Sequence, residues 1–63
     1  MPNVSIIMAS GRPPEKKEDL IKKVTDAVVD SLGVAKESVH IALVEIPREN
    51  IGEAGLPLTK KKP

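Results

Sequence analysis

The stretch that decides the fold is residues 39–46, Val-His-Ile-Ala-Leu-Val-Glu-Ile. Apolar residues occupy both of its alternating sets, with Val39, Ile41 and Leu43 in one and Ala42, Val44 and Ile46 in the other. A run of this kind is typical of a strand that is covered on both faces. We therefore expect a strand at residues 39–46 that is buried on both sides.

A strand and a helix are predicted upstream of this stretch. Residues 3–9 alternate with period two and are rich in β-branched side chains, which indicates a strand. Pro14 can open a helix, because its φ is preset and a first-turn N–H has no partner to lose. An apolar stripe at helical spacing follows, made of Leu20, Ile21, Val24, Ala27, Val28 and Leu32. Gly33 suits a left-handed C-cap that ends the helix. Strand, crossover helix and strand together predict a right-handed parallel β-α-β unit, an α/β (α+β) fold with one long helix.

The rest of the chain is short and punctuated. Gly and Pro recur after Pro47, so we expect loops or a short C-terminal hairpin there. Residues 58–63 contain three consecutive lysines and are expected to form a flexible tail. Residues 1–63 therefore read as a single domain.

The size of the chain predicts self-association. A domain of 63 residues buries only about 60% of its unfolded surface. The chain has no cysteine and one histidine, His40, so neither a disulfide framework nor a structural zinc site can compensate. One helix covers one face of two strands and leaves the other face open. We therefore expect further copies of the chain to cover that face in a symmetric homo-oligomer.

Charge and hydropathy exclude several partners. Ten basic and nine acidic side chains give a net charge of +1, too little to attract nucleic acid or an anionic membrane. No apolar run approaches the ~20 residues that span a bilayer, and the start Met1-Pro2-Asn3 lacks the basic residues of a secretion signal. We expect a cytoplasmic protein without nucleic-acid or membrane partners, and without a metal or cofactor.

Pro2 is the first residue that could carry chemistry. If Met1 is removed, as is usual before a small residue, Pro2 becomes a secondary amine at the N-terminus. Apolar surroundings and a nearby cation both disfavour the charged form of an amine, leaving a neutral base. Such a base could move a proton in an enol or α-keto acid. Proline is about 5% of residues in ordinary proteins, so its position alone decides nothing.

Arg12 is the second such residue. It lies between the predicted first strand and the helix, where side chains often reach a cleft at the strand ends. A guanidinium there could bind a carboxylate through two parallel hydrogen bonds, and its charge would lower the pKa of a neighbouring amine. The alternative is an ordinary solvated loop arginine.

These features together resemble the 4-oxalocrotonate tautomerase family. The resemblance is carried by Met1-Pro2, Ser10-Gly11-Arg12, a helix with Lys16-Lys17 and Leu20-Ile21, and the strand from Val39 to Glu45. It extends from Pro2 to about Gly55, and the length fits that family's short subunit. It implies that Pro2 is the catalytic base and that Arg12 binds the substrate carboxylate. It also implies a keto-enol tautomerase for small unsaturated 2-hydroxy or 2-oxo acids, built as a hexameric trimer of dimers with pockets shared between chains.

Two positions depart from the family pattern. Where that family has a second arginine early in the long strand, this chain has His40, which could donate a hydrogen bond to a carbonyl or simply lie on a strand face. Where the family has a phenylalanine in the late loop, this chain has Ile51, which keeps a pocket apolar without aromatic packing. Arg48 could supply a second cation or be a solvated loop residue. Ser38 is expected to cap or turn.

Two other functions stay open at this point. A related decarboxylase, or a dehalogenase or hydratase, would use the protonated proline as an acid. Its water-activating form would need a carboxylate near Pro2, and Glu45 is the only one in the predicted strands. A catalytically silent scaffold would result if Met1 were retained, because the Pro2 nitrogen would then be an amide.

Overall fold

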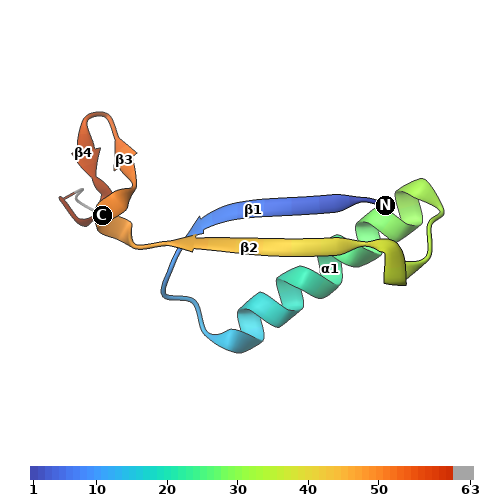
Figure 1. The fold of residues 1–63 in the computed structure, drawn as a ribbon. Helices are drawn as coiled ribbons and strands as arrows, with labels where there is room; N and C mark the ends of the chain where they lie inside the picture. The colour runs from blue at the N-terminus through green and yellow to red at the C-terminus, as the bar shows by residue number, and fades with distance from the viewer. Residues whose placement is uncertain (61–63) are drawn as a thin grey trace.

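A parallel strand pair and one helix form the body of the protomer. The computed structural model describes residues 1–60. Strand β1 (Asn3–Ala9), helix α1 (Pro14–Leu32) and strand β2 (His40–Ile46) follow one another along the chain (Figure 1). The two strands pair in parallel, in register from Asn3 opposite His40 to Ala9 opposite Ile46. The predicted β-α-β unit is therefore confirmed.

The element boundaries follow local signals in the sequence. Helix α1 begins at Pro14 as predicted, and Gly33 closes it with φ at 69° and its N–H donated to the Val29 carbonyl oxygen over 2.9 Å. Strand β2 begins one residue later than predicted. Val39 instead ends a 3-10 turn at Lys36–Ser38, by donating its N–H to the Lys36 carbonyl oxygen over 3.2 Å.

Helix α1 covers one face of the sheet. Its half-buried side chains include the predicted Leu20, Val24 and Val28, whereas Ile21 and Leu32, at the margins of the predicted stripe, are exposed. In the strands, Ile6 and Leu43 are half-buried in the alternating set that faces the helix, whereas the other set has half-buried residues only at the strand ends, Ala9 and Ile46. The opposite face of the sheet carries Ile7, 70% exposed, and Val44, 43% exposed. Strand β2 therefore has only one covered face within a single protomer.

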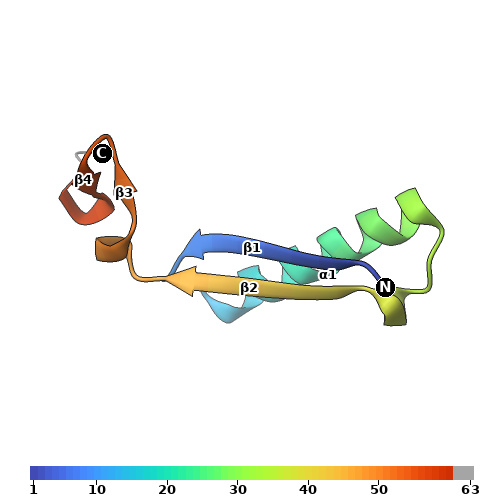
Figure 2. The ribbon, with the colours of Figure 1, turned by 45° about the horizontal axis from the view of Figure 1, so that its top comes forward.

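The C-terminal part extends beyond the sheet. A 3-10 turn at Arg48–Asn50 leads to a hairpin of β3 (Gly52–Glu53) and β4 (Leu56–Pro57), which projects past the end of β2 (Figure 2). The predicted short hairpin is thus present. Of the expected flexible tail, Leu58–Lys60 form a further 3-10 turn, and residues 61–63 lie outside the described residues.

The protomer is far from spherical. Its radius of gyration is 14.8 Å, against roughly 10.6 Å for a compact domain of this length. Its accessible surface is 4884 Å², whereas a compact monomer of this mass would expose about 4,000 Å². Within residues 1–60 no side chain is fully buried. One copy therefore leaves exposed much of the apolar surface that a folded domain normally buries.

Candidate functional site

Pro2 and His40 lie together at one end of the sheet. The backbone N–H of His40 donates to the Pro2 carbonyl oxygen over 3.0 Å. Asn3 and His40 are paired in register, so the side chains of Asn3 and His40 share a sheet face, the one opposite α1. Pro2 is half-buried and His40 is exposed. The expected base and the histidine that follows the first 3-10 turn are therefore neighbours in one protomer.

Arg12 and Ile51 lie beyond the opposite end of the sheet. The Nη1 group of Arg12 donates to the carbonyl oxygen of Ala9, the last residue of β1, over 3.0 Å. Ile51 follows the turn after β2, and it is half-buried. Its N–H donates to the Arg48 carbonyl oxygen over 3.2 Å, and its own carbonyl oxygen accepts the N–H of Leu58 over 2.9 Å. The main chain of Ile51 is thus held on both sides.

The protomer keeps the expected base and the expected anchor apart. The seven residues of β1 lie between Pro2 and Arg12, and at about 3.3 Å per residue they span on the order of 23 Å. Residues 1–60 of one copy enclose no pocket, so the cleft expected at Arg12 is not formed by one protomer. Each end of the sheet carries half of the candidate site, and a pocket that uses both halves needs a second copy.

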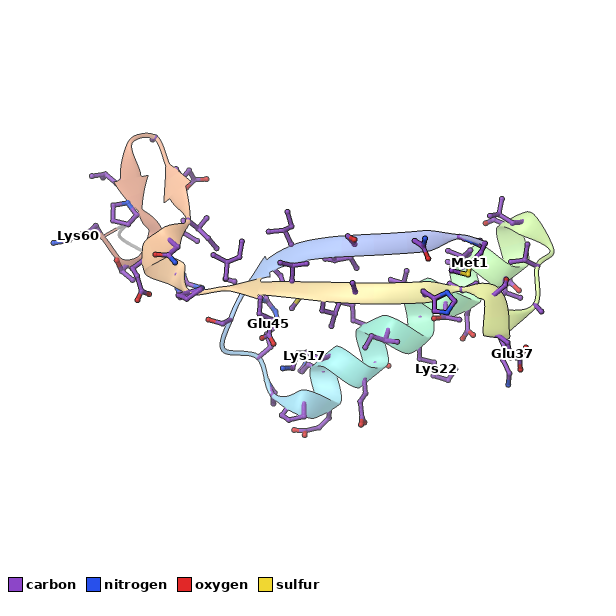
Figure 3. All side chains as sticks on the ribbon, in the orientation of Figure 1. Met1, Lys17, Lys22, Glu37, Glu45 and Lys60 are labelled. Atoms are coloured by element: carbon purple, nitrogen blue, oxygen red, sulfur yellow. The ribbon has the colours of Figure 1, made fainter. Side chains whose placement is uncertain are left out.

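Glu45 forms an ion pair that was not predicted from the sequence. Lys17 donates from Nζ to Oε1 of Glu45 over 2.8 Å, and the two side chains are 29% and 30% exposed. Figure 3 shows them meeting between α1 and β2. Glu45 is paired with Met8, near the end of β1 farther from Pro2. The signal in the sequence was a single charge in the helix-facing set of a strand, since a partly buried charge needs a partner.

The remaining candidates take local roles. The Ser38 hydroxyl donates to the Ala35 carbonyl oxygen over 2.8 Å within its turn, as expected for a turn residue. Arg48 is exposed in the turn next to Ile51, on the side of the molecule away from Pro2. Within residues 1–60, no cluster of His, Asp and Glu could hold a metal ion, and no helix is long and apolar enough to cross a bilayer.

Comparison with known proteins covers nearly the whole chain. Residues 2–61 match the family model described as tautomerase enzyme. The chain is 39% identical, over 56 residues and 89% of each chain, to a 2-hydroxymuconate tautomerase of Comamonas testosteroni. Among solved structures, YwhB, a homologue of 4-oxalocrotonate tautomerase, superimposes with a TM-score of 0.90 at 31% identity, covering 97% of this chain and 100% of that one. A 4-oxalocrotonate tautomerase isozyme from Methylibium petroleiphilum gives 0.88 at 34% identity, covering 92% and 94%. The four candidate residues, Pro2, Arg12, His40 and Ile51, all lie within the residues 2–61 that match the family model.

Proposed function

This chain belongs to the tautomerase family, and from that premise we infer that it interconverts the enol and keto forms of small unsaturated 2-hydroxy and 2-oxo acids. The chain is an isomerase of the 4-oxalocrotonate tautomerase type. The observation that carries the proposed substrate class is its similarity, over 89% of the chain, to a 2-hydroxymuconate tautomerase.

Pro2 serves as the base in the proposed mechanism. Once Met1 is removed, the neutral amine of Pro2 accepts a proton from the substrate and the resulting ammonium returns it to another atom of the same conjugated system. The two transfers restore the amine and shift one double bond, so no cofactor is consumed. Met1 is 81% exposed, which leaves the bond before Pro2 accessible in the protomer.

Arg12 anchors the substrate through a carboxylate. Its guanidinium offers donors in a planar fork that matches a carboxylate, and its charge stabilises the electron density that moves toward that end of the substrate. His40 donates a hydrogen bond to a substrate carbonyl oxygen beside Pro2. Ile51 supplies an apolar wall that favours the neutral form of the amine.

The complete site requires an oligomer. Because about 23 Å of strand separates Pro2 from Arg12 in one copy, the Arg12 and Ile51 half of each pocket comes from a neighbouring copy. The exposed Ile7 and Val44 and the extended shape support a symmetric homo-oligomer, which we propose is a hexamer built as a trimer of dimers. The cytoplasmic location expected from the sequence stays a prediction.

The ion pair of Glu45 favours tautomerisation over the related water-activating reactions. A hydratase or dehalogenase needs a carboxylate beside the proline to activate water. Glu45, the only carboxylate of the β1–β2 sheet, is held by Lys17 over 2.8 Å, and a carboxylate paired with an ammonium is a weaker base toward water. The scaffold alternative depends only on whether Met1 stays attached.

The test combines intact mass with ketonisation assays. We expect the purified protein to lack Met1 and to ketonise 2-hydroxymuconate and phenylenolpyruvate, and Pro2→Ala to lose at least about 100-fold in kcat. A chain with an N-terminal tag, in which the Pro2 nitrogen is an amide, should be inactive until the tag is cleaved before Pro2. Pro47→Ala, at an exposed proline outside the site, is the matched control. Equal activity of the tagged and cleaved chains would rule out Pro2 as the base.

A further inference from the structure

The loop that carries Arg12 is joined to β2 at its first residue. Residues 10–13 connect β1 to α1, and the N–H of Ser10 donates to the Ile46 carbonyl oxygen over 3.0 Å. This hydrogen bond joins the two chain segments one residue beyond Ala9, the last residue of β1. The loop therefore leaves the sheet from a fixed point.

The other end of the loop is joined to β2 through the start of α1. The Pro13 carbonyl oxygen accepts the N–H groups of Lys16 over 3.1 Å and of Lys17 over 3.4 Å. The ammonium of Lys17 in turn contacts Oε1 of Glu45 in β2 over 2.8 Å (Figure 3). The backbone and the side chain of Lys17 thus connect the end of the loop to the sheet.

These two connections meet neighbouring residues of β2. The hydrogen bond ends on Ile46 and the ion pair on Glu45, so residues 10–17 form a ring that β2 closes. Arg12 lies inside this ring. So does Gly11, with φ at 118°, and a glycine gains more backbone freedom than any other residue when a segment is released. The ring therefore restrains a loop that would otherwise be free to move.

The start of α1 is shielded from water only at Lys17. Residues 14–16 are exposed, and the first half-buried apolar side chain of the helix is Leu20, nearly one turn after Lys17. The side chains of Lys17 and Glu45 are 29% and 30% exposed. Water and salt screen a pair of this kind less than one on the open surface. The ion pair is thus the contact that holds the beginning of the helix, and the loop before it, against β2.

We propose that Lys17 and Glu45 are positioning residues for Arg12: their ion pair closes the ring of residues 10–17 and so holds the guanidinium where it binds the substrate carboxylate. The proposal rests on the role of Arg12 as the anchor in the proposed function, and in it neither Lys17 nor Glu45 touches the substrate. Loss of either residue loosens the loop. Loss of both should do no more than loss of one, since the same interaction is removed in all three cases.

The test measures KM and kcat for 2-hydroxymuconate in a set of variants. Lys17→Met and Glu45→Gln should each raise KM about fivefold and lower kcat less than about twofold, because a mobile loop must be ordered when the carboxylate binds. The two substitutions combined should raise KM to the same extent. Lys17→Arg keeps the charged donor, and its KM should stay within about twofold of the original. Lys23→Met is the matched control, because it breaks a 2.9 Å pair with Asp19 that lies within the helix.

Hydrogen exchange tests the ring without the substrate. The N–H of Ser10 closes the ring on its other side, so it should exchange about fivefold faster in Lys17→Met and in Glu45→Gln. The N–H of Gly33 donates to the Val29 carbonyl oxygen at the far end of α1, and its exchange rate should stay the same. An unchanged rate at Ser10 would show that the ion pair does not hold the loop, and the proposal would fail.

The kinetic pattern separates a positioning role from the alternatives. A KM that returns to normal in the double variant would overturn the proposal, because an unpaired charge, and not a mobile loop, would then have raised KM in the single variants. A KM raised by Lys17→Met alone would also overturn it, since Lys17 would then bind the substrate itself. Size-exclusion chromatography checks assembly, and Lys17→Gln replaces Lys17→Met if the latter does not assemble.

Arg12→Ala separates this proposal from the proposed function. In that variant KM should rise, and Lys17→Met added to it should raise KM no further, because the loop then carries no anchor to position. If Arg12→Ala leaves KM unchanged, the anchor assigned in the proposed function fails together with this proposal. If Arg12→Ala raises KM and Lys17→Met adds its full effect to that increase, the positioning role alone is rejected.

Discussion

His40 donates its backbone N–H to the carbonyl oxygen of Pro2 over 3.0 Å, so the first strand is joined to the second at the residue that the proposed function places at the N-terminus. The bond holds the proline at the start of β2 and sets the imidazole of His40 on the sheet face opposite α1. In the proposed oligomer, Pro2 and His40 thus reach the pocket from one copy and Arg12 from another. A substrate would be held at two points by groups that no single chain brings together.

Removal of the imidazole should weaken activity moderately. We expect His40→Leu to lower kcat/KM for phenylenolpyruvate about five- to tenfold, because one hydrogen bond to a substrate carbonyl is lost. His40→Gln keeps a neutral donor and should retain most of the activity. Steady-state kinetics of the three proteins measure the effect. If His40→Leu and the unsubstituted protein turn over equally, His40 is simply a residue on a strand face.

A permanent cation at the same position should change substrate preference. His40→Arg places a charge where a second carboxylate can be bound, so KM for the dicarboxylate 2-hydroxymuconate should fall about three- to tenfold. The monocarboxylate phenylenolpyruvate offers no such group, and its KM should stay the same. Comparison of the two substrates within one variant controls for changes in stability. A parallel change in both KM values would place His40 away from the far end of the substrate.

The fold was predictable because each element of the β-α-β unit follows a short-range pattern. Strand β1 follows from its period of two, the start of α1 from Pro14, and its end from Gly33. The exposure of Ile21 and Leu32 was not predictable in the same way, since a stripe records all the surfaces that a helix covers, including those that other copies provide. Ile7 and Val44 on the open face of the sheet are likewise apolar residues that the protomer itself leaves exposed.

The candidate site was predictable as a set of residues but not as an arrangement. Pro2 and Arg12 are ten positions apart in sequence, which conceals the length of the extended strand between them. The ion pair between Lys17 and Glu45 joins residues 28 positions apart and depends on how α1 crosses the sheet. Helical periodicity gives the direction of a side chain around the helix axis, but it does not give the crossing angle.

A charge on the open sheet face should prevent assembly. Ile7 is 70% exposed in the protomer, and we expect Ile7→Asp to place an unpaired carboxylate in the interface between copies. Light scattering should then report the mass of a smaller species, and activity should be lost with the shared pocket. Ile7→Val, which keeps the face apolar, is the matched control. An Ile7→Asp protein that assembles normally would show that this face is not an interface.

The helix C-cap offers a test of the fold that does not involve the site. Gly33 has φ at 69°, and a Cβ added there would meet nothing within 4 Å, so an alanine costs only backbone strain. Gly33→Ala should lower the free energy of unfolding by about 1 kcal/mol per chain. Urea unfolding at one fixed protein concentration measures this, because the stability of an oligomer depends on concentration. Gly52→Ala, whose added Cβ would lie at an ordinary 3.9 Å from the Leu56 carbonyl oxygen, should change stability much less.

Ile51 tests whether apolar surroundings keep the proposed base neutral. Its main chain is fixed by hydrogen bonds to Arg48 and Leu58, so a change of side chain leaves the segment in place. If Ile51 faces the Pro2 amine of a neighbouring copy, Ile51→Asn makes the surroundings of that amine more polar and raises its pKa toward that of an ordinary amine. The base works in its neutral form, so activity increases as pH rises through this pKa. The acidic limb of kcat/KM against pH should therefore move to higher pH, by about half a unit to one unit. Ile51→Leu keeps the apolar character and should leave the limb where it is. If Ile51→Asn assembles, is active and keeps its acidic limb unchanged, Ile51 lies outside the pocket. An amide next to the Pro2 amine would stabilise the charged form of that amine and so would move the limb.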